Sequence, residues 1–316
     1  MNFLKNPNYD FLGRTRLWVG LSLTLSILGI GYIATHGLHY GVEFSGGTQL
    51  IARFEKTPET DKVRAAVDKV SAGAVIQTYD APSKNQVLIR LAESGQGDQL
   101  SAPAQQVLTS LASGYAENRV VESSTEIVGP IVGAELRDKA VKLTVLGLVF
   151  QLLYIAWRFK GAVWGAAATI AVFHDVIVTL SLLAVLRYEI TLNVIAALLT
   201  LVGYSVNDTI VIFDRVRENL RQRRKDPLPK IINDSINQTL SRTLISSGTT
   251  FLTVLGLFLF GGEVLHSFGL TMVVGIVFGT YSTIYIASPI VVWWENFSKQ
   301  RKAGTGTGTG AGKAAL

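Results

Sequence analysis

An aspartate and an asparagine, Asp208 and Asn207, lie inside a long apolar run of this chain. The run ends at a charged segment that begins with Asp214 and Arg215. An ionised carboxylate near the centre of a membrane-spanning helix costs at least about 2.5 kcal/mol on insertion scales. Asp208 therefore indicates a functional site, where it binds a proton or pairs with a cation. The alternative is a structural carboxylate that neighbouring Ser or Thr hydroxyls satisfy.

Arg242 is the candidate partner of Asp208. It belongs to the segment 241–248, Ser-Arg-Thr-Leu-Ile-Ser-Ser-Gly, at a similar predicted depth from the same side of the membrane. The hydroxyl side chains that follow it are too many for a helix that faces only lipid. An arginine near the end of a span can instead extend its guanidinium to the lipid headgroups. The sequence leaves both interpretations of Arg242 open.

A second polar pair, His174 and Asp175, lies near the middle of another apolar run. Adjacent residues on a helix point about 100° apart, so both side chains cannot face lipid comfortably. Together they could form a proton relay. The alternative is a buried histidine that a neighbouring helix satisfies, and the sequence does not decide between the two.

Several kinds of chemistry have no sequence motif here. The chain contains no cysteine, which excludes disulfides, thiolate metal sites and cysteine nucleophiles. It contains no G-x-x-x-x-G-K-[ST], no H-E-x-x-H and no G-x-S-x-G motif. We therefore expect no enzyme activity, no cofactor and no bound metal. A membrane carboxylate without a nucleotide site favours ion or proton coupling.

The composition predicts a membrane protein, because 48% of the 316 residues are hydrophobic and only 16% are charged. Six apolar stretches are each long enough to span a bilayer as a helix. A signal peptide is the alternative for the first, but its length and the later spans favour an uncleaved anchor. We predict a polytopic α-helical protein with six transmembrane helices, at about 17–35, 139–158, 162–186, 191–213, 243–261 and 267–294.

Six spans place both termini on one side of the bilayer. The same side receives the N-terminal segment 1–16, the charged loop 214–242 and the tail 295–316, whose Gly-Thr repeat predicts flexibility. These segments are rich in Lys and Arg, so the positive-inside rule makes this side the cytoplasm. Topology thus accounts for most of the net charge of +6, and we expect no nucleic-acid partner.

The segment 36–138, between the first two spans, has the composition of a soluble domain. We predict extended chain at 42–54, interrupted by Gly46 and Gly47, as the first element of a domain with the order βαββαβ. The remaining elements are expected at helix 58–71, strands 74–79 and 86–91, helix 98–113 and strand 119–128. This order predicts a ferredoxin-like α+β domain outside the membrane.

Two spans carry residues of one kind at helical spacing. One face of the fourth span is small and polar, which indicates packing against another helix or a water path. Its members are Asn193, Ala196, Thr200, Gly203 and Asn207. The sixth span has small residues every fourth position, a pattern typical of close helix packing. These are Thr271, Gly275, Gly279 and Thr283.

Four motifs together resemble the SecF branch of the SecD/SecF family, in the resistance-nodulation-division superfamily. They are Gly-Val-Glu-Phe-Ser-Gly-Gly-Thr at 41–48, Phe-His-Asp at 173–175, Gly-Tyr-Ser-Val-Asn-Asp-Thr-Ile-Val-Ile-Phe-Asp-Arg-Val-Arg-Glu-Asn at 203–219, and Ser-Arg-Thr at 241–243. The resemblance covers the chain from about residue 14 to residue 294. Glu43 stands where the family commonly has Asp, which keeps the acid in place.

The resemblance implies a subunit of the protein translocation machinery in the bacterial inner membrane. It implies a heterodimer with SecD, action with the SecYEG channel and in many bacteria with YajC, and an unfolded preprotein as the substrate. In this family the proton-motive force is thought to promote translocation. The carboxylate and the arginine held to be needed for proton flow correspond to Asp208 and Arg242.

Our hypothesis is that protonation of Asp208 weakens its attraction to Arg242, and the fourth and fifth helices then repack. Gly46 and Gly47 would act as a hinge that turns this shift into a swing of the outer domain. Two alternatives remain: a proton-driven small-molecule exporter of the same superfamily, and a scaffold of the translocon that transports nothing. The single small outer domain disfavours the exporter, and the polar face of the fourth span disfavours the scaffold.

Overall fold

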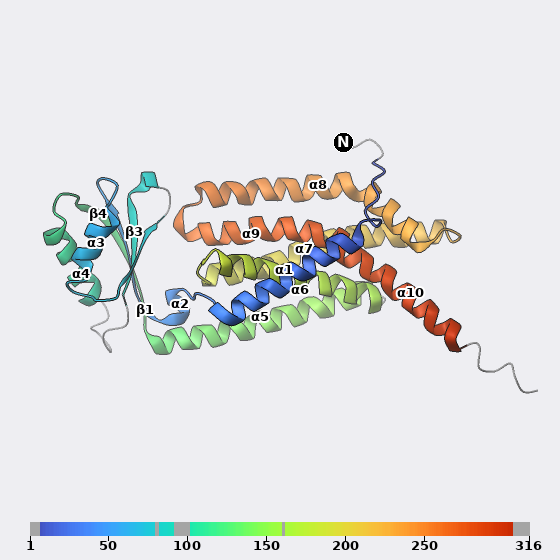
Figure 1. Ribbon diagram of the computed structural model, residues 1–316, viewed down its shortest axis with the longest axis horizontal. Helices are drawn as coiled ribbons and strands as arrows, with labels where there is room; N and C mark the ends of the chain where they lie inside the picture. Colours follow the sequence, from blue (N-terminus) through green and yellow to red (C-terminus); the bar gives the residue numbers. More distant parts are fainter. Residues whose placement is uncertain (1–6, 80–81, 92–101, 160–161, 306–316) are drawn as a thin grey trace, which may run out of the picture.

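The computed structural model of the chain describes residues 7–79, 82–91, 102–159 and 162–305. It consists of a long bundle of helices and a small domain of strands and helices at one end of the bundle (Figure 1). The longer helices of the bundle are α1 (Thr15–His36), α5 (Pro130–Phe159), α6 (Ala162–Val185), α7 (Leu192–Gln222), α8 (Leu228–Phe260), α9 (Gly262–Ser282) and α10 (Ser288–Thr305).

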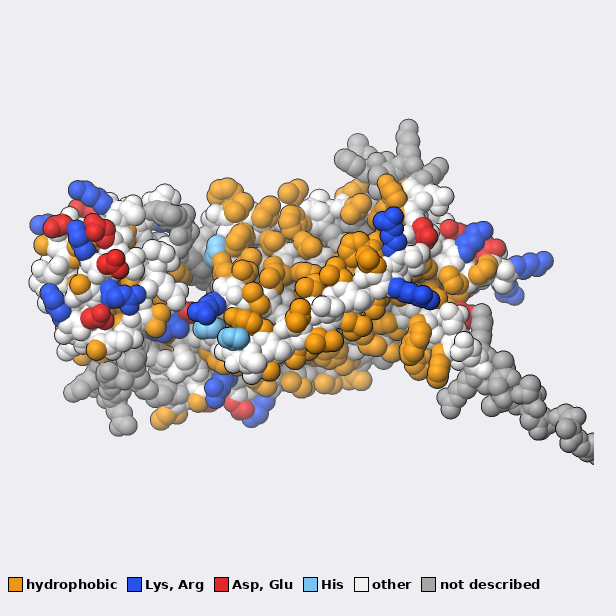
Figure 2. Space-filling model, viewed as in Figure 1, with side chains coloured by type: hydrophobic (Ala, Val, Ile, Leu, Met, Phe, Trp, Pro, Cys, Tyr) orange, Lys and Arg blue, Asp and Glu red, His pale blue; other side chains and the backbone are white. Residues whose placement is uncertain are grey.

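Five segments of the described residues are long and apolar enough to cross a membrane. They are α1, α6, α7, α8 and the continuous stretch Leu265–Ser298, which covers most of α9 and part of α10. Apolar side chains form a band over the bundle, between the charged small domain and the charged opposite end (Figure 2). The predicted second span, 139–158, falls within α5, which is helical but is not among these five segments.

Helix α7 lies at the centre of the bundle and packs against α6, α8 and α9. Phe213 on α7 is fully buried and meets the ring of Trp164 on α6 edge-on, with 5.0 Å between the ring centroids. The small residues expected on the sixth span do pack closely. Thr271 and Thr283 are fully buried, and Gly275 and Gly279 lie against α7.

Gly275 offers a direct test of this close approach. A Cβ atom built on Gly275 would lie 2.5 Å from the two methyl carbons of Leu201 on α7. We expect Gly275→Ala to destabilise the bundle by about 1–3 kcal/mol, because overpacking a filled interface forces its side chains apart. Unfolding in mixed detergent micelles would measure the loss. The matched control is Gly256→Ala on α8, where a Cβ meets nothing within 4 Å.

A π-helix, η3 (Thr283–Ala287), joins α9 to α10. The hydroxyl of Ser288 donates to the carbonyl oxygen of Thr283 at 2.9 Å, and both residues are fully buried. Single π-turns inside α-helices occur frequently at functional sites. Here the π-turn directly follows Ser282, a ligand of the Asp175 carboxylate described below.

The small domain has a four-stranded antiparallel sheet in the order β2-β3-β1-β4. Its elements are α2 (Val42–Ser45), β1 (Gly47–Phe54), α3 (Thr60–Val67), β2 (Val75–Tyr79), the 3-10 turn η1 (Pro82–Lys84), β3 (Gln86–Leu91), α4 (Ala102–Gly114) and β4 (Val120–Val128). Leu50, Ala52, Val63, Ile89 and Leu111 are buried between the sheet and the helices.

The expected order of strands and helices is present in this domain, with two differences. Residues Val42–Ser45 form a helical turn, where the sequence predicted extended chain. A four-residue turn leaves no periodic pattern to detect, and the hydroxyl of Ser45 closes it by donating to the Gly41 carbonyl at 2.9 Å. The predicted start of the second helix, at 98, lies outside the described residues, within which that helix begins at Ala102.

Two predictions about charged segments are wrong. The expected loop 214–242 is mostly helical, because α7 continues to Gln222 and α8 begins at Leu228. Ion pairs on the helical surface, such as Arg215 with Glu218 at 2.6 Å, support α7 beyond the apolar run. The expected flexible tail 295–316 is also helical as far as Thr305, and its remainder, 306–316, lies outside the described residues.

The small domain is attached to the bundle through more than its chain connections. His39–Gly41 pairs with Ile190 in the turn between α6 and α7: Gly41 N donates to Ile190 O at 3.0 Å, and Ile190 N donates to His39 O at 2.7 Å. Next to Ile190, Glu189 forms an ion pair with Arg90 on β3. The start of α7 is therefore joined directly to the small domain.

Candidate functional site

Asp208 lies on α7 with only 2% of its surface exposed. Its Oδ2 atom accepts a hydrogen bond from the hydroxyl of Ser247 on α8, at 2.7 Å. Ser247 is also buried, so the carboxylate is held between two membrane helices. The predicted deep carboxylate is present, and a hydroxyl of the kind expected for the structural alternative binds it.

Arg242 does not contact Asp208. Its side chain is exposed, and within the described residues no ion pair of 4.0 Å or less joins the two. They interact electrostatically only at longer range. The reason is helical geometry: Arg242 precedes Ser247 by five residues, which is about 140° around α8. In this conformation Ser247 therefore faces the carboxylate and Arg242 does not.

The small polar face of α7 is largely exposed on this chain. Ala196, Thr200, Gly203 and Asn207 are all exposed, and Asn207 directly precedes the buried Asp208 in the chain. The sequence predicted that this face packs against another helix or lines a water path. In the chain alone it is open, so Asp208 lies at the border between a packed interior and an uncovered polar surface.

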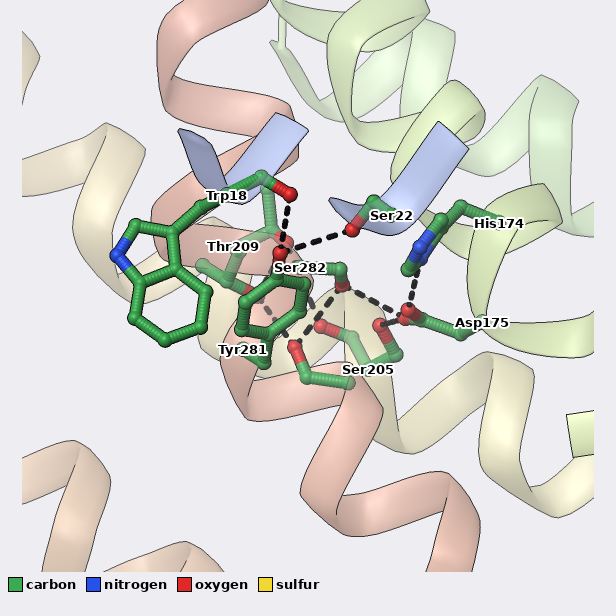
Figure 3. A network of polar contacts seen from close by, with 10 residues as sticks. Trp18, Ser22, His174, Asp175, Ser205, Thr209, Tyr281 and Ser282 are labelled. Carbon is green, nitrogen blue, oxygen red and sulfur yellow. Dashed lines mark hydrogen bonds and ion pairs between the residues drawn. The ribbon is translucent and has the colours of Figure 1, made fainter. Parts of the chain in front are cut away.

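Asp175 forms the second buried carboxylate site (Figure 3). It is fully buried, and its Oδ2 atom accepts hydrogen bonds from Ser205 on α7 at 2.6 Å and from Ser282 on α9 at 2.8 Å. Its Oδ1 atom lies 3.0 Å from Nδ1 of His174. Three helices thus meet at one carboxylate, and the predicted pair of His174 and Asp175 is in direct contact.

The second site continues toward α1. Tyr281 donates its hydroxyl proton to the carbonyl oxygen of Trp18 at 2.7 Å and accepts a hydrogen bond from Ser22 at 2.9 Å. The ring of Tyr281 lies 6.3 Å from that of His174, between centroids. The Nε2 atom of His174 is buried and has no hydrogen-bond partner among the described residues. Only one of the two ring nitrogens of His174, Nδ1, therefore has a hydrogen-bond partner among the described residues.

One helix carries both sites. Ser205, which binds Asp175, precedes Asp208 by three residues on α7. Thr209, which directly follows Asp208, shares a hydrogen bond of 3.0 Å with Thr283 in the π-helix. Asp175 reaches α7 from the side of α6 and α9, whereas Ser247 reaches Asp208 from α8. A displacement of α7 would alter both carboxylate environments.

Asp214, at the end of the apolar run, has an ordinary surface environment. Its side chain is 41% exposed and forms an ion pair with Arg158 at the end of α5. A second, longer pair joins it to Arg217 at 3.9 Å. Exposed ion pairs of this kind contribute about 0–1 kcal/mol. Asp214 is therefore a useful comparison for Asp208, six residues away on the same helix.

The predicted hinge lies where the chain enters the small domain. Gly46 and Gly47 have φ angles of +73° and +121°, which residues other than glycine rarely adopt. Just before them, Glu43 lies in the junction with the bundle. Burial raises the pKa of Glu43, and the charges of Glu126 and Glu189 raise it further, against backbone hydrogen bonds that lower it.

The raised pKa of Glu43 has a defined consequence for stability. The folded junction holds this proton more tightly than the unfolded chain does, so stability is greatest at acid pH. Stability decreases as the pH rises from the ordinary glutamate pKa through the raised one. We expect Glu43→Gln to remove this part of the pH dependence and to stabilise the junction at neutral pH. Thermal unfolding of both forms from acid to neutral pH tests it, and parallel profiles would contradict the prediction.

Sequence reasoning missed the residues that hold the carboxylates. Ser205 and Ser282 are single serines in apolar runs, and only the fold brings them to Asp175. Ser247 belonged to a hydroxyl-rich segment that drew attention, but no pattern identified it as the partner of Asp208. Among the described residues, no group of three His, Cys, Asp or Glu side chains could hold a metal ion.

Comparison with known proteins places this chain in a family. The family model "Protein export membrane protein SecD/SecF, C-terminal" matches residues 107–297, and the model "SecD/SecF GG Motif" matches residues 31–58. The chain is 40% identical over 308 residues to the protein translocase subunit SecF of Calditerrivibrio nitroreducens, covering 95% of this chain and 99% of that one. It is 41% identical over 303 residues to SecF of Magnetococcus marinus, covering 95% and 96%.

A solved structure agrees with these relatives. The crystal structure of SecDF from Thermus thermophilus, described as a translocon-associated membrane protein, matches with a TM-score of 0.80 and 38% identity. The match covers 92% of this chain but only 39% of the SecDF chain, so this chain corresponds to a part of SecDF. The chain is thus a multi-pass inner-membrane protein of the Sec protein transport pathway, and it belongs to the SecD/SecF family as a relative of the SecF subunits.

Proposed function

We propose that this chain is the SecF-type subunit of a SecD–SecF complex that uses the proton-motive force to promote protein translocation through the SecYEG channel, with YajC as a further partner. The substrate is an unfolded preprotein. The chain catalyses no reaction and needs no cofactor. Proton movement involves Asp208 and Arg242, with His174 and Asp175 as a second titratable pair and Asn207 at the entrance to Asp208.

One observation carries the proposal: Asp208 is buried, yet it borders an exposed polar face. A carboxylate is costly to place in a membrane interior, and such residues usually mark a functional site. Ser247 is its one hydrogen-bond partner identified among the described residues, whereas Asp175 has three. Asp208 accepts fewer hydrogen bonds than Asp175 and lies next to an uncovered surface, so it is better placed to exchange a proton.

The proposed partner explains the uncovered face of α7. Thr200, Gly203 and Asn207 are too small and polar to favour lipid, and a SecD-type subunit would cover them and leave a water path between the two chains. Arg242, also exposed, would face the same path. In that complex the longer-range attraction between Arg242 and Asp208 would depend on whether the carboxylate holds a proton.

The proposed topology has six spans and both termini in the cytoplasm. Support for the second span, 139–158, comes from α5, which exposes the large apolar side chains of Leu143, Phe150 and Leu153 along one stretch. We propose a ferredoxin-like fold for the outer domain, supported by the strand order and the two helices that cover the sheet. The basic segments support the orientation through the positive-inside rule.

The route from proton to outer domain runs along α7. Protonation of Asp208 removes its charge, and with it the attraction to Arg242, so α7 and α8 repack. The N-terminal end of α7 follows Glu189 and Ile190, which contact the outer domain through Arg90 and the pairing with Gly41. A shift of α7 would therefore reach the outer domain directly, and Gly46 and Gly47 would allow the domain to turn.

The test uses the whole complex in proteoliposomes with SecYEG and the ATP-driven motor. A preprotein is first moved part of the way with ATP, and its completion is then followed with and without an imposed proton gradient. We expect the gradient to accelerate completion only when this chain is present with its SecD-type partner. Acceleration without the chain would contradict the proposal, and completion that needs the chain but not the gradient would favour the scaffold.

A further inference from the structure

We propose that the free edge of β4, together with the groove beside α4, binds an extended segment of unfolded polypeptide by strand addition. The inference deepens the proposed function, on which it rests, by naming the surface of this chain that holds the preprotein. Four observations on the described residues lead to it: an open strand edge, an uncovered strand face, a groove beside it, and the position of the strand at the membrane.

The first observation is the open edge. Strand β4 lies at the end of the sheet and, within the described residues, pairs only with β1. It is nine residues long, against five for β2 at the opposite edge. Edge strands are usually protected by Pro, by charged side chains, by β-bulges or by a short length, because their free N–H and C=O groups attract other strands. The sequence of β4, Val-Val-Glu-Ser-Ser-Thr-Glu-Ile-Val, has neither Pro nor Lys. Its one pairing irregularity lies at the start of the strand, and Glu122 is paired with Arg53 on β1, so the stretch after Ser123 carries Glu126 as its one charge.

The second observation is that the helices stop short of β4. Leu50 and Ala52 on β1 are fully buried beneath the helices, and they pair with Thr125 and Ser123 on β4. Residues paired in this way point to the same face of the sheet. Nevertheless Thr125 and Ser123 are exposed, as is all of β4 except its two end residues. The helix layer therefore leaves the same face of β4 uncovered.

The third observation is a groove beside the first part of this uncovered strand, where β4 contributes Val120–Ser123 to the lining. A cavity of about 510 Å³ lies between α4 and β4. Its walls combine apolar side chains with polar ones, including Leu108, Ala112, Arg119, Val121, Glu122 and Ser123. A fifth strand added to β4 would place every second side chain on the groove side of the sheet. A groove of mixed lining would accept side chains of many kinds.

The geometry favours a polypeptide over any other ligand. A strand edge presents N–H and C=O groups that repeat about every 6.6 Å, and only another extended backbone repeats with the same spacing. Binding through the backbone is tolerant of sequence, and the pockets beside it supply only modest preference. Such tolerance is what a site for diverse unfolded chains requires.

The fourth observation is the position of β4 relative to the membrane. The strand ends at Val128, and only Gly129 separates it from α5. Its partner β1 begins at Gly47, opposite Val128, directly after the chain leaves α2. This end of the β1–β4 pair therefore lies at the bundle, and the other end points away. A chain bound along β4 would run from the membrane surface outward.

The sequence contains no cysteine, and the neighbouring serines Ser123 and Ser124 point to opposite faces of β4, which makes a sharp test possible. The full chain is placed in nanodiscs, alone and with its SecD-type partner. The probe is a fluorescein-labelled peptide of alternating Val and Ser, whose binding is followed by fluorescence anisotropy. A second probe carries N-methyl groups on all of its amides, which removes the N–H donors needed for pairing along either edge. A cysteine placed on β4 allows the bound peptide to be crosslinked and its position confirmed.

The matched variants are Ser123→Trp and Ser124→Trp. Both serines are exposed, but Ser123 lines the groove and Ser124 pairs with Ile51 on the opposite face. We expect Ser123→Trp to weaken peptide binding about tenfold or more, Ser124→Trp to change it less than about twofold, and the methylated probe not to bind. Equal effects of the two variants would overturn the inference.

Two further outcomes separate this inference from neighbouring ones. Peptide binding to the chain alone but not to the complex would mean that the partner covers β4, which also overturns it. Because peptide binding needs no proton gradient, its failure while gradient-driven translocation persists would remove this inference and leave the proposed function intact. Normal peptide binding without gradient-driven translocation would support this inference and contradict the proposed function.

Discussion

Replacement of Asp208 by Asn is expected to abolish the acceleration of preprotein translocation by a proton gradient. Asn keeps an oxygen that can accept the hydrogen bond from Ser247, so the contact between α7 and α8 survives. What disappears is the group that takes up and releases a proton. We expect translocation to fall to the rate measured without a gradient, while the ATP-driven part of the reaction stays unchanged. The proteoliposome assay described above measures both parts.

Two further variants serve as comparisons for Asp208→Asn. Asp214→Asn makes the same chemical change six residues later, at a half-exposed ion pair, and should retain the response to the gradient. Arg242→Ala removes the guanidinium, which does not touch Asp208 in this conformation, and should weaken the response if the attraction matters in the complex. Full acceleration in Asp208→Asn would exclude this carboxylate from the proton path.

Replacement of Asp175 by Ala is expected to cost about 3–5 kcal/mol of stability, because three buried groups lose their partner and each unsatisfied group costs about 1–3 kcal/mol. The change leaves the hydroxyls of Ser205 and Ser282 and the Nδ1 atom of His174 without their common partner, in a site with no exposed surface. Unfolding in mixed detergent micelles, followed by circular dichroism, measures the loss.

The comparison for Asp175 is Asp138→Ala on α5. That carboxylate is 61% exposed and pairs with Lys142 at 2.6 Å, so its removal should cost no more than about 1 kcal/mol. Asp175→Asn retains one oxygen acceptor and should lose clearly less than the alanine variant. Similar losses for Asp175→Ala and Asp138→Ala would show that the three-helix network around Asp175 adds little to stability.

The architecture was largely predictable, because membrane spans are long apolar runs and the strands of the outer domain are short apolar runs bounded by turn residues. Strands in the outer domain were expected from the short apolar runs around Leu50 and Ile89, which turn residues separate from the predicted helices. The ends of elements were less predictable. The charged segment around Arg215 and Glu218 was predicted as a loop because it follows a membrane span and is polar. Its ion pairs at helical spacing instead support a helix.

The site was predictable only in part. Apolar surroundings identify Asp208 and Asp175, because few other features of a sequence are as costly as a carboxylate in a membrane span. Their partners depend on how helices rotate against each other, which the sequence does not reveal. Arg242 was a reasonable partner by depth, but the rotation of α8 brings Ser247 to the carboxylate instead. Depth follows from counting residues, whereas the facing side requires the packed bundle.

The ion pair between Arg90 and Glu189 has a mechanical consequence. The outer domain is fixed where the chain enters at Gly46 and where it leaves at Gly129, and these points are close, since a Cβ on Gly133 would lie 3.0 Å from Gly46 N. A rigid body held at two points keeps one degree of freedom, rotation about the line between them. Arg90 and Glu189 supply a third point off that line, which stops the rotation. Separation of this pair, together with the pairing of Gly41 and Ile190, would permit rotation of the domain about that one line.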